Sequence, residues 1–182
     1  LGVMGYPMAG HLAKHGVAVT VYNRTAAKAE QWLAEYIQYG DCATAATPRQ
    51  AAEAADVVFM CVGNDDDVRS VTLGEDGALA GMSSGAFLVD HTTASQQLAV
   101  ELASACAAAG IAFLDAPVSG GQAGAENAAL TIMLGGSEED YRDVQPLLDV
   151  YAKKTALMGA VGAGQLTKMV NQICIAGVLQ GL

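Results

Sequence analysis

Short apolar runs alternate with longer amphipathic segments along the 182 residues of the chain. Val57–Val62 is an uninterrupted apolar run, and Phe87–Asp90 is a second run that ends in a carboxylate. Continuous apolar runs of this length are typical of strands buried on both faces of a parallel sheet. By the same criterion we predict strands at residues 17–22, 111–114 and 130–134, with residues 43–46 as a short strand or loop.

Helical spacing fills most of the segments between these runs. Met8, Leu12 and Ala13 fall on one face of a predicted first helix that Gly16 ends, and Asn64 before three aspartates fits the cap of a short helix. Further helices are expected at residues 26–35, 47–55, 92–109, 137–148 and from 165 to Leu182. Strands that alternate with helices predict an α/β fold with a doubly wound, mostly parallel sheet, which binds ligands at the carboxyl ends of its strands.

Composition narrows the classes of protein. Hydrophobic residues make up 52% of the chain and charged residues 15%, which excludes a disordered polypeptide. The net charge of -10 argues against nucleic acid or an anionic membrane as a partner, so an anionic ligand needs a local binding site. No apolar run approaches the roughly 20 residues of a membrane span.

The cysteines and histidines indicate no metal or redox centre. The four cysteines form no C-x-x-C pair, and we expect reduced, buried thiols of a cytoplasmic protein: Cys42, Cys61, Cys106 and Cys174. The three histidines lack the spacing of metal ligands and are interpreted as structural or surface residues: His11, His15 and His91.

A glycine turn precedes the first predicted helix. Leu1-Gly2-Val3-Met4-Gly5 has the spacing of the last two glycines of G-x-G-x-x-G, in which a helix N-terminus receives a pyrophosphate. We expect the first glycine and its strand to lie before Leu1. The turn therefore predicts a Rossmann-type dinucleotide-binding domain, with an ordinary helix-capping turn as the alternative.

The residues after the second predicted strand bear on the choice of cofactor. An NAD-selective site usually has a carboxylate there that binds the ribose hydroxyls. This chain has Asn23-Arg24-Thr25, in which Arg24 can clamp a 2′-phosphate and its neighbours can donate hydrogen bonds to it. We therefore predict that NADP is preferred over NAD; a solvated surface role for Arg24 is the alternative.

Four segments in order resemble the β-hydroxyacid dehydrogenase family, which includes 3-hydroxyisobutyrate dehydrogenase and the tartronate semialdehyde and succinic semialdehyde reductases. The N-terminal turn is similar to that family's G-L-G-x-M-G-x-x-M signature. The other three resemble its D-x-S-T, D-A-P-V-S-G-G and G-x-G-x-x-x-K-x-x-N segments: Asp90–Thr93, Asp115–Gly121 and Gly162–Asn171.

The resemblance implies roles for the matching residues. Lys168 corresponds to the catalytic lysine, and Ser119-Gly120-Gly121 to the loop that holds the substrate carboxylate. Burial on an apolar helix would lower the pKa of such a lysine. Asn171 and Gln172 share its helical face, and either is a candidate substrate contact. Residues that follow predicted strands are expected to contact the cofactor. Thr93 would lie near the nicotinamide. Four residues of the buried strand and the turn after it would border the adenosine ribose: Met60, Val62, Gly63 and Asn64.

The implied protein is an NADP-preferring oxidoreductase that transfers hydride between nicotinamide and a small 3-hydroxyacid or its semialdehyde, without a metal. We expect residues 1–161 to form the NADP-binding domain. Residues 162–182 would begin a long helix leading to an all-helical domain, outside this chain, that makes a homo-oligomer. A non-catalytic binding module, an imine reductase and a 6-phosphogluconate dehydrogenase are the alternatives. Lys168 argues against the first two, and the scarcity of basic residues argues against the third.

Overall fold

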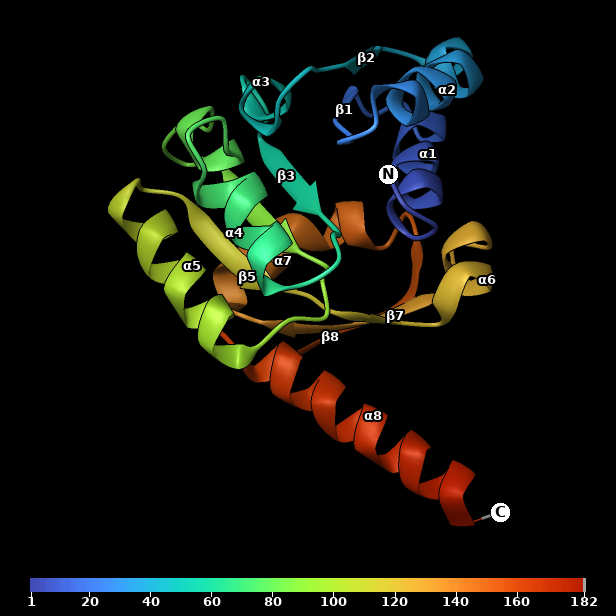
Figure 1. Cartoon of the computed structure of the whole chain (residues 1–182), viewed down its shortest axis with the longest axis vertical. Coiled ribbons are helices and arrows are strands. Elements are labelled where there is room, and N and C mark those ends of the chain that lie inside the picture. The colour runs from blue at the N-terminus through green and yellow to red at the C-terminus, as the bar shows by residue number, and fades with distance from the viewer. Residues whose placement is uncertain (182) are drawn as a thin grey trace.

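The computed structural model describes residues 1–181 and shows helices packed around a twisted sheet (Figure 1). The strands are β1 (Val19–Val21), β2 (Cys42–Thr44), β3 (Val57–Met60), β4 (Phe87–Asp90), β5 (Ala112–Asp115), β6 (Val118–Ser119), β7 (Leu130–Gly135) and β8 (Ala152–Gly159). The α-helices are α1 (Gly5–Lys14), α2 (Ala26–Tyr36), α3 (Pro48–Ala52), α4 (Asp65–Leu73), α5 (Gln96–Ala108), α6 (Gly121–Glu126), α7 (Glu138–Leu148) and α8 (Ala163–Gly181). Two short 3-10 helices are η1 (Ile37–Tyr39) and η2 (Ala78–Ala80).

The predicted α/β class with a mostly parallel sheet is confirmed. In the larger sheet the strands follow the order β3-β4-β5-β7-β6, and β8 pairs with β7. β3, β4 and β5 run parallel to one another, as do β7 and β8, whereas β7 runs antiparallel to β5 and β6. β1 and β2 form a separate parallel pair beside α1 and α2 (Figure 1).

The central strands are covered on both faces. In β4, Leu88 packs into a cluster with α4 and α5, while the next residue, Val89, packs into a cluster with α1 and α7. Phe113 and Leu114 of β5 divide between the same two clusters. Because successive side chains of a strand point to opposite faces, this division requires a helix layer on each side.

Three segments differ from the sequence prediction. The apolar pattern predicted no strand between residues 149 and 161, but β8 lies there with Lys153 and Lys154 exposed. The segment Ser119–Gly121 was expected as a loop, but Ser119 ends β6 and Gly121 begins α6. Gly120 lies between them with a φ of 131°. The predicted helix from residue 92 begins only at Gln96, after Ser95 has capped it.

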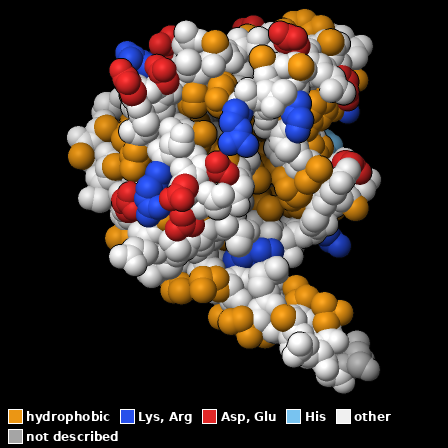
Figure 2. Space-filling model, in the orientation of Figure 1, with side chains coloured by type: hydrophobic (Ala, Val, Ile, Leu, Met, Phe, Trp, Pro, Cys, Tyr) orange, Lys and Arg blue, Asp and Glu red, His pale blue; other side chains and the backbone are white. Residues whose placement is uncertain are grey.

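α8 projects from the body of the molecule (Figure 1), and apolar side chains lie along it (Figure 2). The expected buried cysteines are found at Cys42 and Cys106, but that prediction is wrong for Cys174, which is exposed on α8, and Cys61 is half-buried. An apolar run in a projecting helix has too few neighbours to bury its side chains. The predicted end of this helix at Leu182 lies outside the described residues.

Candidate functional site

Two adjoining hollows lie beside β1, β3 and the loop after β4. The larger, of about 910 Å³, separates β1 from β3: core side chains such as Val19 and Phe59 line its length, and its end at the carboxyl ends of these strands reaches the N-terminal end of α1. The smaller, of about 420 Å³, lies between the β4 loop, the β6 end and α8. Met4, Val62 and Gly63 line both hollows, so the two form one continuous site.

The larger hollow brings together most residues predicted to bind the dinucleotide. Its lining includes Leu1–Gly5, Asn23–Thr25, Met60, Val62 and Gly63. The Leu1 nitrogen donates to Oδ1 of Asn23 at 2.9 Å, which joins the glycine turn to the end of β1. A Cβ added to Gly2 or Gly5 would meet no atom within 4 Å, so the turn presents bare backbone to open space.

Arg24 lies at the open end of this hollow. Its side chain is 87% exposed, and its guanidinium lies 3.6 Å from the carboxylate of Asp67, in the first turn of α4. Lys28 lines the same hollow. This end of the site therefore carries two cations that can reach an anionic group, together with one carboxylate that competes for Arg24.

Two of the predicted cofactor residues have structural tasks. The side chain of Met60 is buried in the core on the α4 and α5 side, where the Thr72 hydroxyl donates to its sulfur at 3.2 Å. Asn64 lines neither hollow and caps α4, because its Oδ1 accepts from the Asp67 nitrogen at 2.9 Å.

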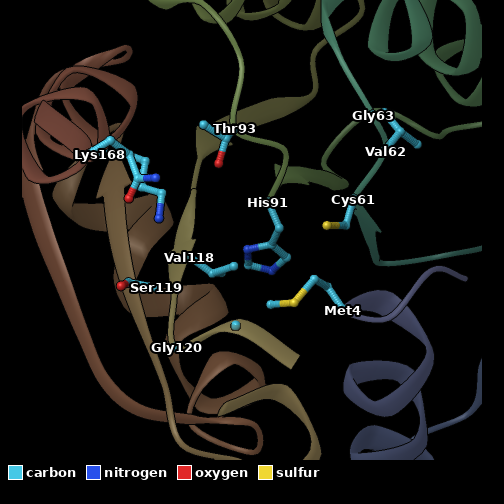
Figure 3. Close-up of a pocket in the computed structure, with 12 residues that line it drawn as sticks. Met4, Cys61, Val62, Gly63, His91, Thr93, Val118, Ser119, Gly120 and Lys168 are labelled. Carbon is cyan, nitrogen blue, oxygen red and sulfur yellow. The ribbon is translucent and has the colours of Figure 1, made fainter. Parts of the chain in front are cut away.

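The smaller hollow assembles residues from three distant segments. Lys168 of α8, Ser119 of β6 and Thr93 of the loop after β4 all line it. Figure 3 shows Lys168 and Ser119 on one side of this hollow, Met4 and Cys61 on the other, and His91 between them. Lys168 is 8% exposed, and burial lowers the pKa of its ammonium group, which favours the neutral amine that can accept a proton.

The structure separates the two amide side chains that the sequence could not distinguish. Gln172 lines the smaller hollow with Lys168, Gly120 and Gly121. Asn171 does not line it, and its Nδ2 lies 3.5 Å from Oε1 of Gln172. Gln172 is therefore the better placed of the two to reach a ligand in this hollow.

His91 also lines this hollow, although sequence reasoning gave it no role there. Its Nδ1 lies 2.7 Å from the Ala116 carbonyl and its Nε2 lies 2.8 Å from the Tyr151 hydroxyl. Because a carbonyl only accepts, Nδ1 carries the proton and Nε2 accepts from Tyr151. Burial lowers the pKa of His91 to about 4, and its ring stacks parallel to Phe59 with centroids 5.8 Å apart.

A buried carboxylate stabilises the loop that follows β4. Oδ1 of Asp90 accepts from the Thr92 nitrogen at 2.8 Å, and the Thr92 hydroxyl accepts from the Val62 nitrogen at 3.0 Å. Asp90 is 2% exposed, and burial raises its pKa to about 7. The loops after β3 and β4 are thus joined directly beneath the site.

A second buried carboxylate and an amide attach α8 to the sheet, and sequence reasoning assigned neither. Oδ1 of Asp115 accepts from the Gly162 nitrogen at 2.6 Å and Oδ2 accepts from the Gln165 nitrogen at 2.9 Å. The Gln165 side chain bonds to the backbone of Thr92 and Ala94. The signal in the sequence was their place within two of the segments that resemble the family: Asp115–Gly121 and Gly162–Asn171.

Within residues 1–181, no group of three or more histidine, cysteine, aspartate or glutamate side chains is arranged to hold a metal ion. Over the same residues, no helix is long and apolar enough to cross a membrane.

Comparisons with known proteins agree with this geometry. The sequence profile of the NAD binding domain of 6-phosphogluconate dehydrogenase matches residues 1–160. An uncharacterized oxidoreductase of Shewanella frigidimarina is 62% identical over 182 residues, which is 100% of this chain and 61% of that protein. A probable 3-hydroxyisobutyrate dehydrogenase-like protein of Arabidopsis thaliana is 43% identical over 100% of this chain and 53% of its own length.

A solved structure is similar over nearly the whole chain. The 3-hydroxyisobutyrate dehydrogenase of Mycobacterium tuberculosis, solved with L-serine, superposes with a TM-score of 0.88 at 34% identity. The match covers 97% of this chain and 58% of that one. The chain therefore spans between half and two thirds of the length of these relatives.

Proposed function

Because the chain belongs to the β-hydroxyacid dehydrogenase family, we propose that it is the dinucleotide-binding part of an oxidoreductase acting on a small 3-hydroxyacid or its semialdehyde, with NADP preferred over NAD. Residues 1–161 form the cofactor domain in this proposal, and residues 162–182 begin the helix that leads out of it. The observation that carries the proposal is the smaller hollow, where Lys168, Ser119 and Thr93 converge beside the glycine turn.

The end of the larger hollow between the glycine turn and Asn23–Thr25 suits a nicotinamide dinucleotide. Gly2 and Gly5 let a pyrophosphate approach the N-terminal end of α1, where free backbone N–H groups and the helix dipole favour negative charge. Arg24, with Asn23 and Thr25 beside it, would hold a 2′-phosphate at the other end. The bare glycine backbone and the cationic rim fit the two anionic parts of NADP.

In this proposal Ser119, Gly120 and Gly121 hold the substrate carboxylate, and Gln172 orients the hydroxyl. The positive φ of Gly120 and Gly121, 131° and 61°, is a conformation that side chains disfavour, so glycine suits both positions. A carboxylate held there would fix the reacting carbon near Thr93 and within reach of Lys168.

Lys168 is the proposed general acid and base. A bound nicotinamide dinucleotide would supply the chemistry of hydride exchange with the substrate carbon. Nζ of Lys168 would take the hydroxyl proton during oxidation and return it during reduction. Its burial supports this role because burial lowers the pKa of the ammonium group and so raises the fraction of neutral amine that can accept a proton.

Cofactor preference is tested by fluorescence titration of the whole protein with NADPH and NADH. We expect NADPH to bind more tightly and Arg24→Ala to remove that preference, which corresponds to about 1–3 kcal/mol for a charge-assisted contact. Arg142→Ala is the matched control because Arg142 is exposed on α7 and pairs with Glu138. Equal binding of the two cofactors by the wild type would show that the interpretation of Asn23-Arg24-Thr25 is wrong.

The reaction is tested with a panel of small semialdehydes and NADPH. Lys168→Met is expected to lower kcat by roughly 10²–10⁴-fold while NADPH still binds, because general acid-base catalysis contributes about that factor. Lys154→Met, which changes an exposed lysine of β8, is expected to leave kcat unchanged. Reduction of cyclic imines but of no semialdehyde would favour an imine reductase, and binding without any turnover would favour a non-catalytic module.

A further inference from the structure

We propose that Gln165 is a positioning residue: its side-chain amide fastens the loop that carries Thr93 to the helix that carries Lys168, and so sets the distance between the nicotinamide and the proton-transfer group. This inference rests on the proposed function. It concerns a residue that touches neither hollow but bonds to the backbone on both sides of Thr93.

Both polar atoms of the Gln165 side-chain amide form hydrogen bonds. Its Oε1 accepts from the Ala94 nitrogen at 3.0 Å, and its Nε2 donates to the Thr92 carbonyl at 2.7 Å. Thr93 lies between these two contacts, so its backbone cannot shift without breaking one of them. Gln165 is 1% exposed, which means that water does not compete for either bond.

The helix side of this connection is rigid as well. Gln165 and Lys168 are three residues apart in α8, about one turn, so their side chains keep a constant relation. The Gln165 nitrogen donates to Oδ2 of Asp115 at 2.9 Å. A Cβ added to Gly164 would clash with the Met133 carbonyl, so the first turn of α8 already packs tightly against β7.

The loop side continues to the proposed cofactor site. The Thr92 hydroxyl accepts from the Val62 nitrogen at 3.0 Å, and Val62 lines both hollows. Hydrogen bonds therefore run from the cofactor lining at Val62 through Thr92 to Gln165, and the helix carries the connection to Lys168. A displacement of about 1 Å between reacting groups can cost roughly 10²-fold in rate, so this connection can control kcat without touching substrate.

Two variants separate positioning from folding. Gln165→Met keeps the approximate length of the side chain and removes both bonds, while Gln165→Glu keeps the bond from Ala94 and places an acceptor against the Thr92 carbonyl. Thr155→Val is the control, because it removes a partly buried hydrogen bond to Tyr141 on the α7 side of the molecule. Amide exchange at Ala94 reports the contact itself, and we expect it to accelerate in Gln165→Met but not in Gln165→Glu or in the control.

The kinetic readout is kcat for the best semialdehyde, together with the isotope effect from NADPH deuterated at the transferred C4 position. Both Gln165 variants are expected to lower kcat by roughly 10- to 100-fold, to raise the isotope effect and to leave the Kd for NADPH within about threefold of wild type. A merely structural role would lower the melting temperature and the active fraction without moving the isotope effect.

The outcomes distinguish this inference from the function on which it rests. An active wild type whose Gln165 variants keep the wild-type kcat and isotope effect overturns the positioning role and leaves the proposed function standing. A wild type that binds NADPH and reduces no carbonyl substrate overturns both. Unchanged Ala94 exchange in Gln165→Met overturns the contact from which the argument starts.

Discussion

Replacement of Asp115 by asparagine tests how firmly the first turn of α8 is held. The Asp115 carboxylate is fully buried and accepts from the Gly162 and Gln165 nitrogens at 2.6 and 2.9 Å. It is also an anion at the N-terminal end of a helix, where the dipole favours negative charge. Asp115→Asn preserves the shape of the side chain, removes the charge and turns one of the two acceptors into a donor.

The size of the effect follows from these contacts. One backbone N–H would face the new NH₂ group and lose its partner, which costs about 1–3 kcal/mol, and the other bond would change from charge-assisted to neutral, which costs about 1 kcal/mol. The relief of a buried charge offsets part of this, because burial raises the pKa of Asp115. We expect a net loss of about 2 kcal/mol, equivalent to roughly 4–8 °C in Tm for a protein of this size.

Thermal unfolding followed by circular dichroism measures the loss directly. Asp143→Asn is the matched control, because Asp143 is exposed on α7 and its replacement is expected to leave Tm within about 1 °C of wild type. An Asp115→Asn variant that melts with the wild type would refute the reasoning, since it would mean that these two bonds contribute nothing net. The two Asp115 bonds would then no longer support the proposal that the first turn of α8 holds Lys168 in a fixed position.

Three further predictions concern other polar groups. Burial raises the pKa of Asp90 from 3.8 to about 7, so the contribution of Asp90 to stability falls as pH rises between those values. Burial lowers the pKa of His91 from 6.5 to about 4, so the contribution of His91 to stability rises with pH over that range. Asp90→Asn should therefore make the slope of the urea-derived free energy of unfolding between about pH 4 and 6.5 more positive than in the wild type, and an unchanged slope would contradict this assignment. Tyr151→Phe leaves Nε2 of His91 without its donor and should cost about 1–3 kcal/mol in thermal melts, while an unchanged Tm would mean that the bond contributes nothing. Asp67→Asn frees Arg24 and should tighten NADPH but not NADH a few-fold at low salt by fluorescence titration, and an equal gain for both cofactors would disprove competition at Arg24.

Strand prediction succeeded for β4, which is buried on both faces of the sheet, and failed for β8, which is partly exposed. β4 is covered on both faces, so Phe87, Leu88 and Val89 form a continuous apolar run that reveals the strand. β8 pairs with β7 within the described residues and leaves Lys153 and Lys154 exposed, so its local pattern resembles a surface loop. The backbone hydrogen bonds to β7, which no local pattern encodes, decide that this segment is a strand.

The amino-acid sequence by itself determined the residue types on which the proposed chemistry depends: the glycine turn before α1, Ser119-Gly120-Gly121 after a strand, and Lys168 on an apolar helix. Local requirements, namely backbone space and helical spacing, are compatible with these residue types, and the resemblance to the family assigned the roles of Ser119-Gly120-Gly121 and Lys168. Only the tertiary structure decided that Gln172 rather than Asn171 lines the hollow with Lys168, and that Gln165 reaches the backbone 71 residues earlier in the chain. Periodicity states which residues share a helix face, but the packing of the whole molecule decides what that face meets.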